Sequence, residues 1–378
     1  MSVSAKSIKV TQDDTPMMQQ YRGIKKEYSD SILFFRMGDF YEMFNEDAKT
    51  ASGILQIALT ARNKKTNPVP MCGIPHHSAN LYITKLLKAG KKVAICEQTE
   101  DPKQAKGLVK REVVRVITPG TILDDNILDP KKDQFIASVY FGKNQIGLAA
   151  LDVSTGVFKV TQINGENTLS ILADELQKLD PKEIIIPSSI KEETRPWLPA
   201  GEVFIHTGED WTFSFSEAYK NLIEHFKTQS LEGFGCENME AAISSAGALI
   251  HYLRETQKSA MEHITALTPF PIQDYMAVDQ CTLASLELVQ SSEGSRKNSL
   301  LDLLDLSQTP MGARRIREWI LKPLIDTEKI CERLNIVADF KDKPIERKKL
   351  RDLLKHIFDL ERLLGRITLS ACNARDLI

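Results

Sequence analysis

The sequence lacks the features that mark a membrane or secreted protein. No apolar run approaches the ~20 residues that a membrane-spanning helix needs, and the first 14 residues have no apolar core like that of a signal peptide. Hydrophobic residues make up 42% of the chain and charged residues 26%, as in ordinary globular proteins. We therefore expect a cytoplasmic protein without a membrane partner, and its 378 residues predict two or three domains.

Cysteine is sparse and follows no pattern. The six cysteines form no CxxC pair and lie far apart, at positions 72, 96, 236, 281, 331 and 372. This spacing favours reduced thiols over disulfides. His76 and His77 are adjacent, but no carboxylate or cysteine stands at a suitable spacing from them. We interpret both as structural residues and expect no metal site.

The chain also lacks the excess of positive charge typical of DNA-binding proteins, since its formal net charge is −2. The charge is unevenly distributed, however. Residues 1–130 contain 19 Lys and Arg against 15 Asp and Glu, so this part carries +4 and the remainder −6. The first third of the chain is therefore the part whose charge favours contact with phosphates.

A phosphate-binding loop for ATP is absent as well. The pattern G-x-x-x-x-G-K-[ST], whose backbone cradles nucleotide phosphates, occurs nowhere in the sequence. We expect no catalytic residues, no cofactor and no ATP hydrolysis in this chain.

An aromatic and acidic stretch stands out at residues 31–44, SILFFRMGDFYEMF. Its apolar beginning predicts a buried strand, and Gly38 permits a sharp turn after it. Asp39 and Glu42 have the spacing of a capping box. That spacing predicts a helix that begins at Asp39 and holds Phe40 and Glu42 in its first turn.

The residues alone leave two interpretations of Phe40 and Glu42 open. An aromatic ring at a rim stacks on flat apolar groups, and side chains that wedge between base steps kink DNA. A carboxyl group beside such a ring would hydrogen-bond the displaced base. Alternatively, Phe40 is a core side chain and Glu42 caps the helix.

The stretch resembles the Phe-x-Glu mismatch-reading motif of the MutS family of DNA mismatch-repair proteins. Three further segments match the N-terminal domain of that family in order and spacing, namely PMCGIPHH at 70–77, VAICEQ at 93–98 and RVITPGT at 115–121. A later family motif is matched by TPMGARR at 309–315 and WILKPL at 319–324. One departure is Ala284-Ser285, where family members usually carry an arginine and an asparagine. Whether this departure changes the local packing or a contact made by a tail in that domain is left open.

The resemblance implies a multidomain protein with α/β and all-α parts. Residues 1–128 would form a mixed α/β mismatch-recognition domain, 129–266 an RNase-H-like connector domain, and 267–378 the beginning of a helical core, or lever, domain. The clamp, dimerisation and ATPase segments of the family lie further along. We therefore expect an N-terminal fragment of a protein roughly twofold longer, with ATP, Mg and homodimer formation belonging to the full-length protein.

The resemblance also implies partners. The ligand would be double-stranded DNA with mismatches or small insertion or deletion loops, and the connector would dock a MutL-type partner. Phe40 would stack on a mispaired base from the minor groove, because poor stacking lowers the cost of bending there. Glu42 would hydrogen-bond that base. A purine ring nitrogen requires protonated Glu42, whereas the ionised form suffices for a thymine N–H, and the mismatch spectrum stays open.

Further DNA contacts are predicted near a basic turn. Arg62, Lys64 and Lys65 either contact phosphates or form a solvated hairpin after a strand at 56–62. Pro70 and Met71 would line the groove as apolar contacts, in a strand at 69–74 that either lies at a sheet edge or ends quickly, because its prolines limit hydrogen bonding. The other elements predicted here are helices at 15–28 and 78–89, with Ser78 as N-cap, and strands at 91–98 and 112–117.

The middle of the chain predicts a meander, a helix and a buried strand, the order of RNase-H-like domains. The strands are expected at 135–141, 145–152 and 157–162, the helix at 169–179 and the last strand at 183–187. Asp152 ends a strand where RNase-H-type nucleases keep a metal-binding aspartate, but two-metal chemistry needs several converging carboxylates. The alternative is an ordinary strand end with a turn. Beyond it we predict helices at 216–226 and 239–259, a linker at 268–271, and helices at 327–340, 344–357 and 358–367.

Overall fold

The computed structural model describes residues 15–62, 68–100, 107–124, 127–190, 197–199, 203–369, 371–372 and 374–377. The chain forms two compact units. Unit 1 contains the chain up to Pro119 together with Thr256–Lys258, and unit 2 contains Gly120–Glu255 and the chain from Ser259 onward. The predicted combination of mixed α/β parts and a helical part is confirmed.

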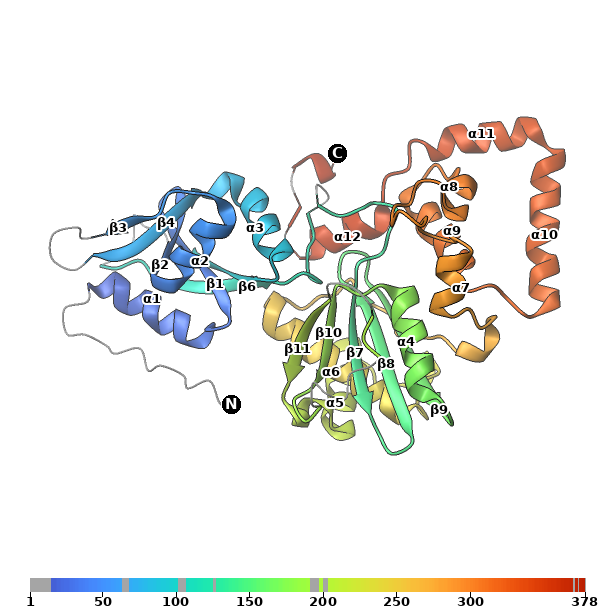
Figure 1. The fold of residues 1–378 in the computed structure, drawn as a ribbon, viewed down its shortest axis with the longest axis horizontal. Coiled ribbons are helices and arrows are strands. Elements are labelled where there is room, and N and C mark those ends of the chain that lie inside the picture. The colour runs from blue at the N-terminus through green and yellow to red at the C-terminus, as the bar shows by residue number, and fades with distance from the viewer. Residues whose placement is uncertain are drawn as a thin grey trace. The chain divides into compact units, whose positions relative to one another are not determined.

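Unit 1 is a six-stranded mixed sheet with helices on both faces (Figure 1). The strand order is β3-β4-β2-β1-β5-β6, in which β1 and β5 are parallel and all other neighbours antiparallel. The strands are β1 Ser31–Met37, β2 Phe40–Phe44, β3 Thr60–Arg62, β4 Val69–Pro75, β5 Lys92–Gln98 and β6 Arg111–Ile117. The helices are α1 Pro16–Glu27, α2 Asn45–Leu55 and α3 Ala79–Lys88.

The core of unit 1 is built on the apolar run of β1. Leu33 and Phe35 pack with Met17 and Tyr21 of α1 on one face of the sheet, while the next residue in alternation, Phe34, points to the opposite face. All three β1 side chains are fully buried. A strand covered on both faces carries a continuous apolar sequence, which explains why the strand was predicted correctly here.

The helix predicted from Asp39 is wrong. β1 and β2 form a hairpin in which Met37 pairs with Phe40, so the connection consists of Gly38 and Asp39 alone. Gly38 has φ +58°, a conformation that suits glycine at the first central position of a tight hairpin turn. The helix α2 begins only at Asn45. The aromatic residues of β2 gain more from pairing within the sheet than the local capping-box spacing offers.

Three other predictions in unit 1 need correction. Because α2 continues to Leu55 and ends on Gln56 in the left-handed conformation, the strand predicted at 56–62 is reduced to β3. β3 pairs with β4 and takes the edge, so β4 is an interior strand despite its prolines. Ser78 precedes α3 as predicted, but its hydroxyl donates to the Pro75 carbonyl instead of capping the helix.

Unit 2 contains a second six-stranded sheet, covered by α4 on one face and by α5 and α6 on the other (Figure 1). The strand order is β11-β10-β7-β8-β9-β12. The strands are β7 Phe135–Phe141, β8 Gln145–Asp152, β9 Val157–Asn164, β10 Glu183–Pro187, β11 Phe204–Gly208 and β12 Thr268–Pro269. The helices are α4 Thr168–Leu179, α5 Phe215–Phe226 and α6 Glu240–Gln257. The predicted meander, helix and strand are confirmed.

Two strands of unit 2 were not predicted. β11 is half-exposed and pairs in parallel with β10. β12 lies where a linker was predicted, and it is a two-residue strand parallel to β9. Both are edge strands that are defined by a partner distant in sequence, so their own residues carry little signal.

A helical segment completes unit 2. Its helices are α7 Gln280–Ser285, α8 Leu300–Leu304, α9 Pro310–Leu321, α10 Thr327–Asp342, α11 Pro344–Leu354 and α12 Leu360–Thr368. The last three correspond to the predicted helices, although α11 ends earlier than expected. Among all described residues, no helix is both long and apolar enough to cross a membrane.

Candidate nucleic-acid interface

Phe40 and Glu42 lie on the same face of β2, at the end of the β1–β2 hairpin. Residues two apart on a strand share a face, and Phe44 continues this row into the core beneath α1. The Phe40 side chain is 49% exposed, Glu42 is half-buried and Phe44 is fully buried. Phe40 is therefore an exposed aromatic ring at the open end of an otherwise covered sheet face.

The exposure of Phe40 follows from where α1 stops covering the sheet. Tyr21 of α1 packs edge-on against Phe44 with ring centroids 5.0 Å apart. Further along β2, Phe40 is paired with Met37 on one side and with Pro75 on the other. These two neighbours were not singled out from the sequence, because only the hairpin register brings them beside Phe40.

Glu42 lies next to two arginines of the same unit. The Arg62 Nη1 atom is 3.4 Å from Glu42 Oε2, and Arg111 contributes a second, more distant positive charge. Burial raises the pKa of the Glu42 carboxyl, while the charges of Arg62 and Arg111 oppose this, and the net direction is upward. A carboxyl in this setting takes up a proton more readily than an exposed glutamate.

Arg111 is a site residue that the sequence did not reveal. Its Nε donates to the Arg36 carbonyl at 2.7 Å, and its Nη1 donates to the side-chain oxygen of Gln20 at 3.2 Å and to the Val109 carbonyl at 3.0 Å. Its guanidinium also lies 5.0 Å from the centroid of the Phe35 ring. Arg111 is thus a fixed, buried cation. Spacing along the chain does not indicate this contact, because Arg111 reaches the site from β6, two strands away from β1 across the sheet.

The opposite face of β2 holds the hairpin in place. Tyr41, between Phe40 and Glu42, is buried, and its hydroxyl donates to the Glu97 carboxylate. Arg36 pairs with the same carboxylate at 3.4 Å. Burial and the neighbouring Glu97 raise the pKa of Tyr41, so its hydroxyl stays protonated. These contacts fix the strand that carries Phe40 and Glu42.

The other residues that were predicted to contact DNA lie in different places. Met71 pairs with Phe44 and therefore faces the same side as Phe40 and Glu42, whereas Pro70 pairs with Ala61 and faces the opposite side. Arg62 joins the site through Glu42. Lys64 and Lys65 lie outside the described residues.

His76, the first of the two adjacent histidines, has a structural role. The backbone N–H of His76 donates to the Asp39 carbonyl at 2.9 Å, and its Nδ1 lies 3.1 Å from the same oxygen. His76 therefore ties the end of β4 to the hairpin turn. Within the described ranges, no group of three or more His, Cys, Asp or Glu side chains is placed to hold a metal ion.

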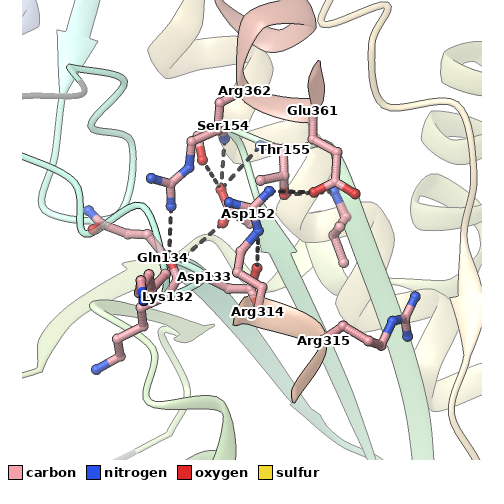
Figure 2. Close-up of polar contacts among 12 residues, drawn as sticks. Lys132, Asp133, Gln134, Asp152, Ser154, Thr155, Arg314, Arg315, Glu361 and Arg362 are labelled. Atoms are coloured by element: carbon pink, nitrogen blue, oxygen red, sulfur yellow. Dashed lines mark hydrogen bonds and ion pairs between the residues drawn. The ribbon is translucent and has the colours of Figure 1, made fainter. Parts of the chain in front are cut away.

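Asp152, the alternative candidate in unit 2, is fully buried and accepts hydrogen bonds at both carboxylate oxygens (Figure 2). One carboxylate oxygen accepts from the Ser154 N–H at 2.8 Å and from the Ser154 hydroxyl at 2.6 Å. The other accepts from the Gln134 N–H at 2.8 Å. A carboxylate engaged in this way organises the turn after β8, which supports the structural interpretation of Asp152 over the nuclease alternative.

Comparison with known proteins gives matches along most of the chain. Family profiles described as MutS domain I, MutS domain II and MutS domain III match residues 15–126, 134–265 and 281–378. A DNA mismatch repair protein MutS of Halothermothrix orenii is 47% identical over 371 residues, which cover 96% of this chain and 41% of the relative. Proteins of the same name from Desulforapulum autotrophicum and Symbiobacterium thermophilum are 45% and 43% identical, covering 96% of this chain and 42% of each relative. The chain thus spans about two-fifths of the length of these relatives.

Proposed function

This chain belongs to the MutS family, whose domains I, II and III it carries, and we propose that it serves DNA mismatch repair by recognising mismatched or unpaired bases with unit 1. The observation that supports this most strongly is the exposed Phe40 ring beside the half-buried Glu42 on one strand face. As domain limits we propose residues 1–128, 129–266 and 267–378.

Phe40 acts as a wedge in this proposal. A mispaired base is poorly stacked, so inserting a ring beside it costs less than at a paired step. The ring is held in place from behind, because β2 is fixed by the buried side chains of Tyr41 and Met43. Selectivity then comes largely from the ease with which the DNA deforms.

Glu42 makes the hydrogen bond to the base that Phe40 displaces. Its raised pKa supports a protonated carboxyl, which donates to a purine ring nitrogen. Opposite an undamaged duplex, the same group in its ionised form repels the phosphates and so disfavours binding to the wrong ligand.

Replacing Phe40 by Ala tests this proposal. Stacking of a base on an aromatic side chain is worth about 1–3 kcal/mol, so the preference for a G·T heteroduplex over the matched homoduplex should fall by about 5- to 150-fold. Competition binding followed by fluorescence anisotropy, at one fixed salt concentration, measures both affinities. Leu81→Ala in α3 is the matched control, because Leu81 is another exposed apolar side chain of unit 1. An unchanged preference in the Phe40 variant would remove the wedge from the mechanism.

A second proposed function is docking of a MutL-type partner by unit 2. Two exposed aromatic side chains, Trp211 and Phe215, support this, since aromatic residues are enriched in protein interfaces. Trp211 packs edge-on against His251, with ring centroids 5.1 Å apart, so its position is fixed before binding.

Trp211→Ala separates docking from mismatch recognition. We expect this variant to weaken binding to a MutL-type protein in surface plasmon resonance by about tenfold or more, as for an aromatic interface anchor. Its heteroduplex preference should stay unchanged. Phe40→Ala should show the reverse pattern, and loss of both properties in either variant would contradict the assignment of the two functions to different units.

A further inference from the structure

The Arg62 guanidinium covers the carboxylate that the proposed mechanism needs. Arg62 lies on the edge strand β3, and its side chain crosses the Phe44 ring, 6.0 Å from the ring centroid, to reach Glu42. The closest N···O distance is 3.4 Å, and the two side chains are 35% and 20% exposed. Among the described residues, Glu42 is the hydrogen-bond acceptor of Arg62.

The two arginines near Glu42 differ in how firmly they are held. Arg111 is bound by the Arg36 carbonyl, the Val109 carbonyl and Gln20. Arg62 has a partly exposed contact with Glu42 at a sheet edge, and ion pairs of this kind are weak. A phosphate is therefore able to draw Arg62 away, whereas it is not able to move Arg111.

We propose that Arg62 is a specificity-determining residue, which keeps the Glu42 carboxylate in an ion pair until a DNA phosphate competes for the guanidinium. The inference rests on the proposed function of unit 1. In this proposal the Glu42 carboxylate becomes available to hydrogen-bond a base only after the DNA backbone has bound Arg62. Arginine suits this role because its planar fork matches phosphate as well as carboxylate.

Departure of Arg62 changes the protonation of Glu42. The groups that act on Glu42 are Arg62 from β3 and Arg111 from β6, and both lower its pKa, while burial raises it. Its strand neighbours Phe35 and Gly73 carry no charge. Without Arg62, and with phosphate charges nearby, the pKa of Glu42 rises further. The protein then takes up a proton on binding, so heteroduplex affinity should decrease as the pH rises through the pKa of the complex.

The ion pair is tested first without DNA. The full chain is labelled with ¹³C at glutamate carboxyl groups and titrated by NMR, with Glu42→Gln to identify the signal of Glu42. In Arg62→Met the titration of Glu42 should move to higher pH than in the wild type. Lys88→Met, which removes an exposed charge at the end of α3, should leave it unchanged. An identical Glu42 titration in the wild type and Arg62→Met would overturn the inference and leave the proposed function intact.

The same variants are then measured with DNA. Adding matched homoduplex should shift the Glu42 titration of the wild type toward higher pH, and the shift should be smaller in Arg62→Met, where only the phosphate charges act. Because one phosphate contact is lost, the slope of log K against log salt should be smaller by about 1 in Arg62→Met. If homoduplex leaves the Glu42 titration of the wild type unchanged, Arg62 does not leave Glu42 for a DNA phosphate, and the inference is refuted. If the wild type binds heteroduplex and homoduplex equally, the proposed function itself fails, and the DNA-free titration still reports on the ion pair.

Discussion

An Arg314→Met chain should lose about 3 kcal/mol of the free energy of unfolding of unit 2, because the exchange removes a buried cation and leaves partly buried carboxylates without their counter-charge. Arg314 of α9 is only 5% exposed. It binds both carboxylate oxygens of Asp359, at 2.6 and 2.8 Å, and Glu361 at 2.6 Å. It also donates to the Pro130 carbonyl at 2.9 Å. Arg314 lies 3.6 Å from Asp133, and Figure 2 shows it beside Asp133 and Glu361.

The loss should depend on pH in a definite direction. Burial alone would raise the pKa of Asp359, but Arg314 lowers it below its usual value. A carboxyl with a depressed pKa contributes stability above its unfolded pKa and loses it as the pH falls. The pKa of Asp133 is raised to about 6 by burial and by Asp152, so this group is neutral below that pH. The difference between wild type and variant should therefore be largest near pH 7 to 8 and shrink in acid.

Denaturant unfolding followed by tryptophan fluorescence measures this effect. All three tryptophans, Trp197, Trp211 and Trp319, belong to unit 2, so the signal reports on that unit alone. Arg315→Met is the matched control, since Arg315 is the next residue of α9, is mostly exposed and pairs with Glu318 on the surface. Equal losses in the two variants would contradict the buried-network explanation.

Gly147→Ala should destabilise unit 2 by about 3 kcal/mol, the upper end of the usual cost of overpacking. Gly147 lies in β8, where α6 crosses the sheet. A Cβ atom at this position would be 1.8 Å from the Ala241 carbonyl oxygen and 2.7 Å from the Ala242 nitrogen. These are backbone atoms, which are unable to turn aside as a flexible side chain does, so the helix has to move away from the sheet.

The same fluorescence assay applies to this variant, with Gly233→Ala as its control. Nothing lies within 4 Å of a Cβ atom placed at Gly233, so this exchange should be close to neutral. A Gly147 variant as stable as the wild type would show that α6 does not press on β8 as described.

The positions of strands that are covered on both faces could be predicted accurately from the sequence. β7, β8 and β10 lie where expected, because α4 covers one face of their sheet and α5 and α6 the other. Their sequences are accordingly continuous apolar runs bounded by turn residues. The edge strands β11 and β12 could not be predicted in this way, since pairing with a distant strand defines them.

The candidate site was found from the sequence, but its local structure was not. The motif identified Phe40 and Glu42, and the exposure of the ring agrees with the predicted position at a rim. The spacing of Asp39 and Glu42 satisfies a helix cap and a hairpin equally well, and only pairing with β1 and β4 selects the hairpin. The neighbours Met37 and Pro75 follow from that pairing, whereas Arg111 is brought near by the pairing of β6 with β5 and of β5 with β1.

The sequence by itself determined the family, the strands that are covered on both faces and the aromatic and acidic pair of the candidate site, because these depend on residue identity and spacing along the chain. The tertiary structure decided which strand face carries that pair, how far each side chain is exposed, and which charges lie beside Glu42. These properties depend on strands that are distant in sequence and adjacent in the sheet. Burial and neighbouring charges, which set the protonation of a carboxyl group, exist only once those strands have come together.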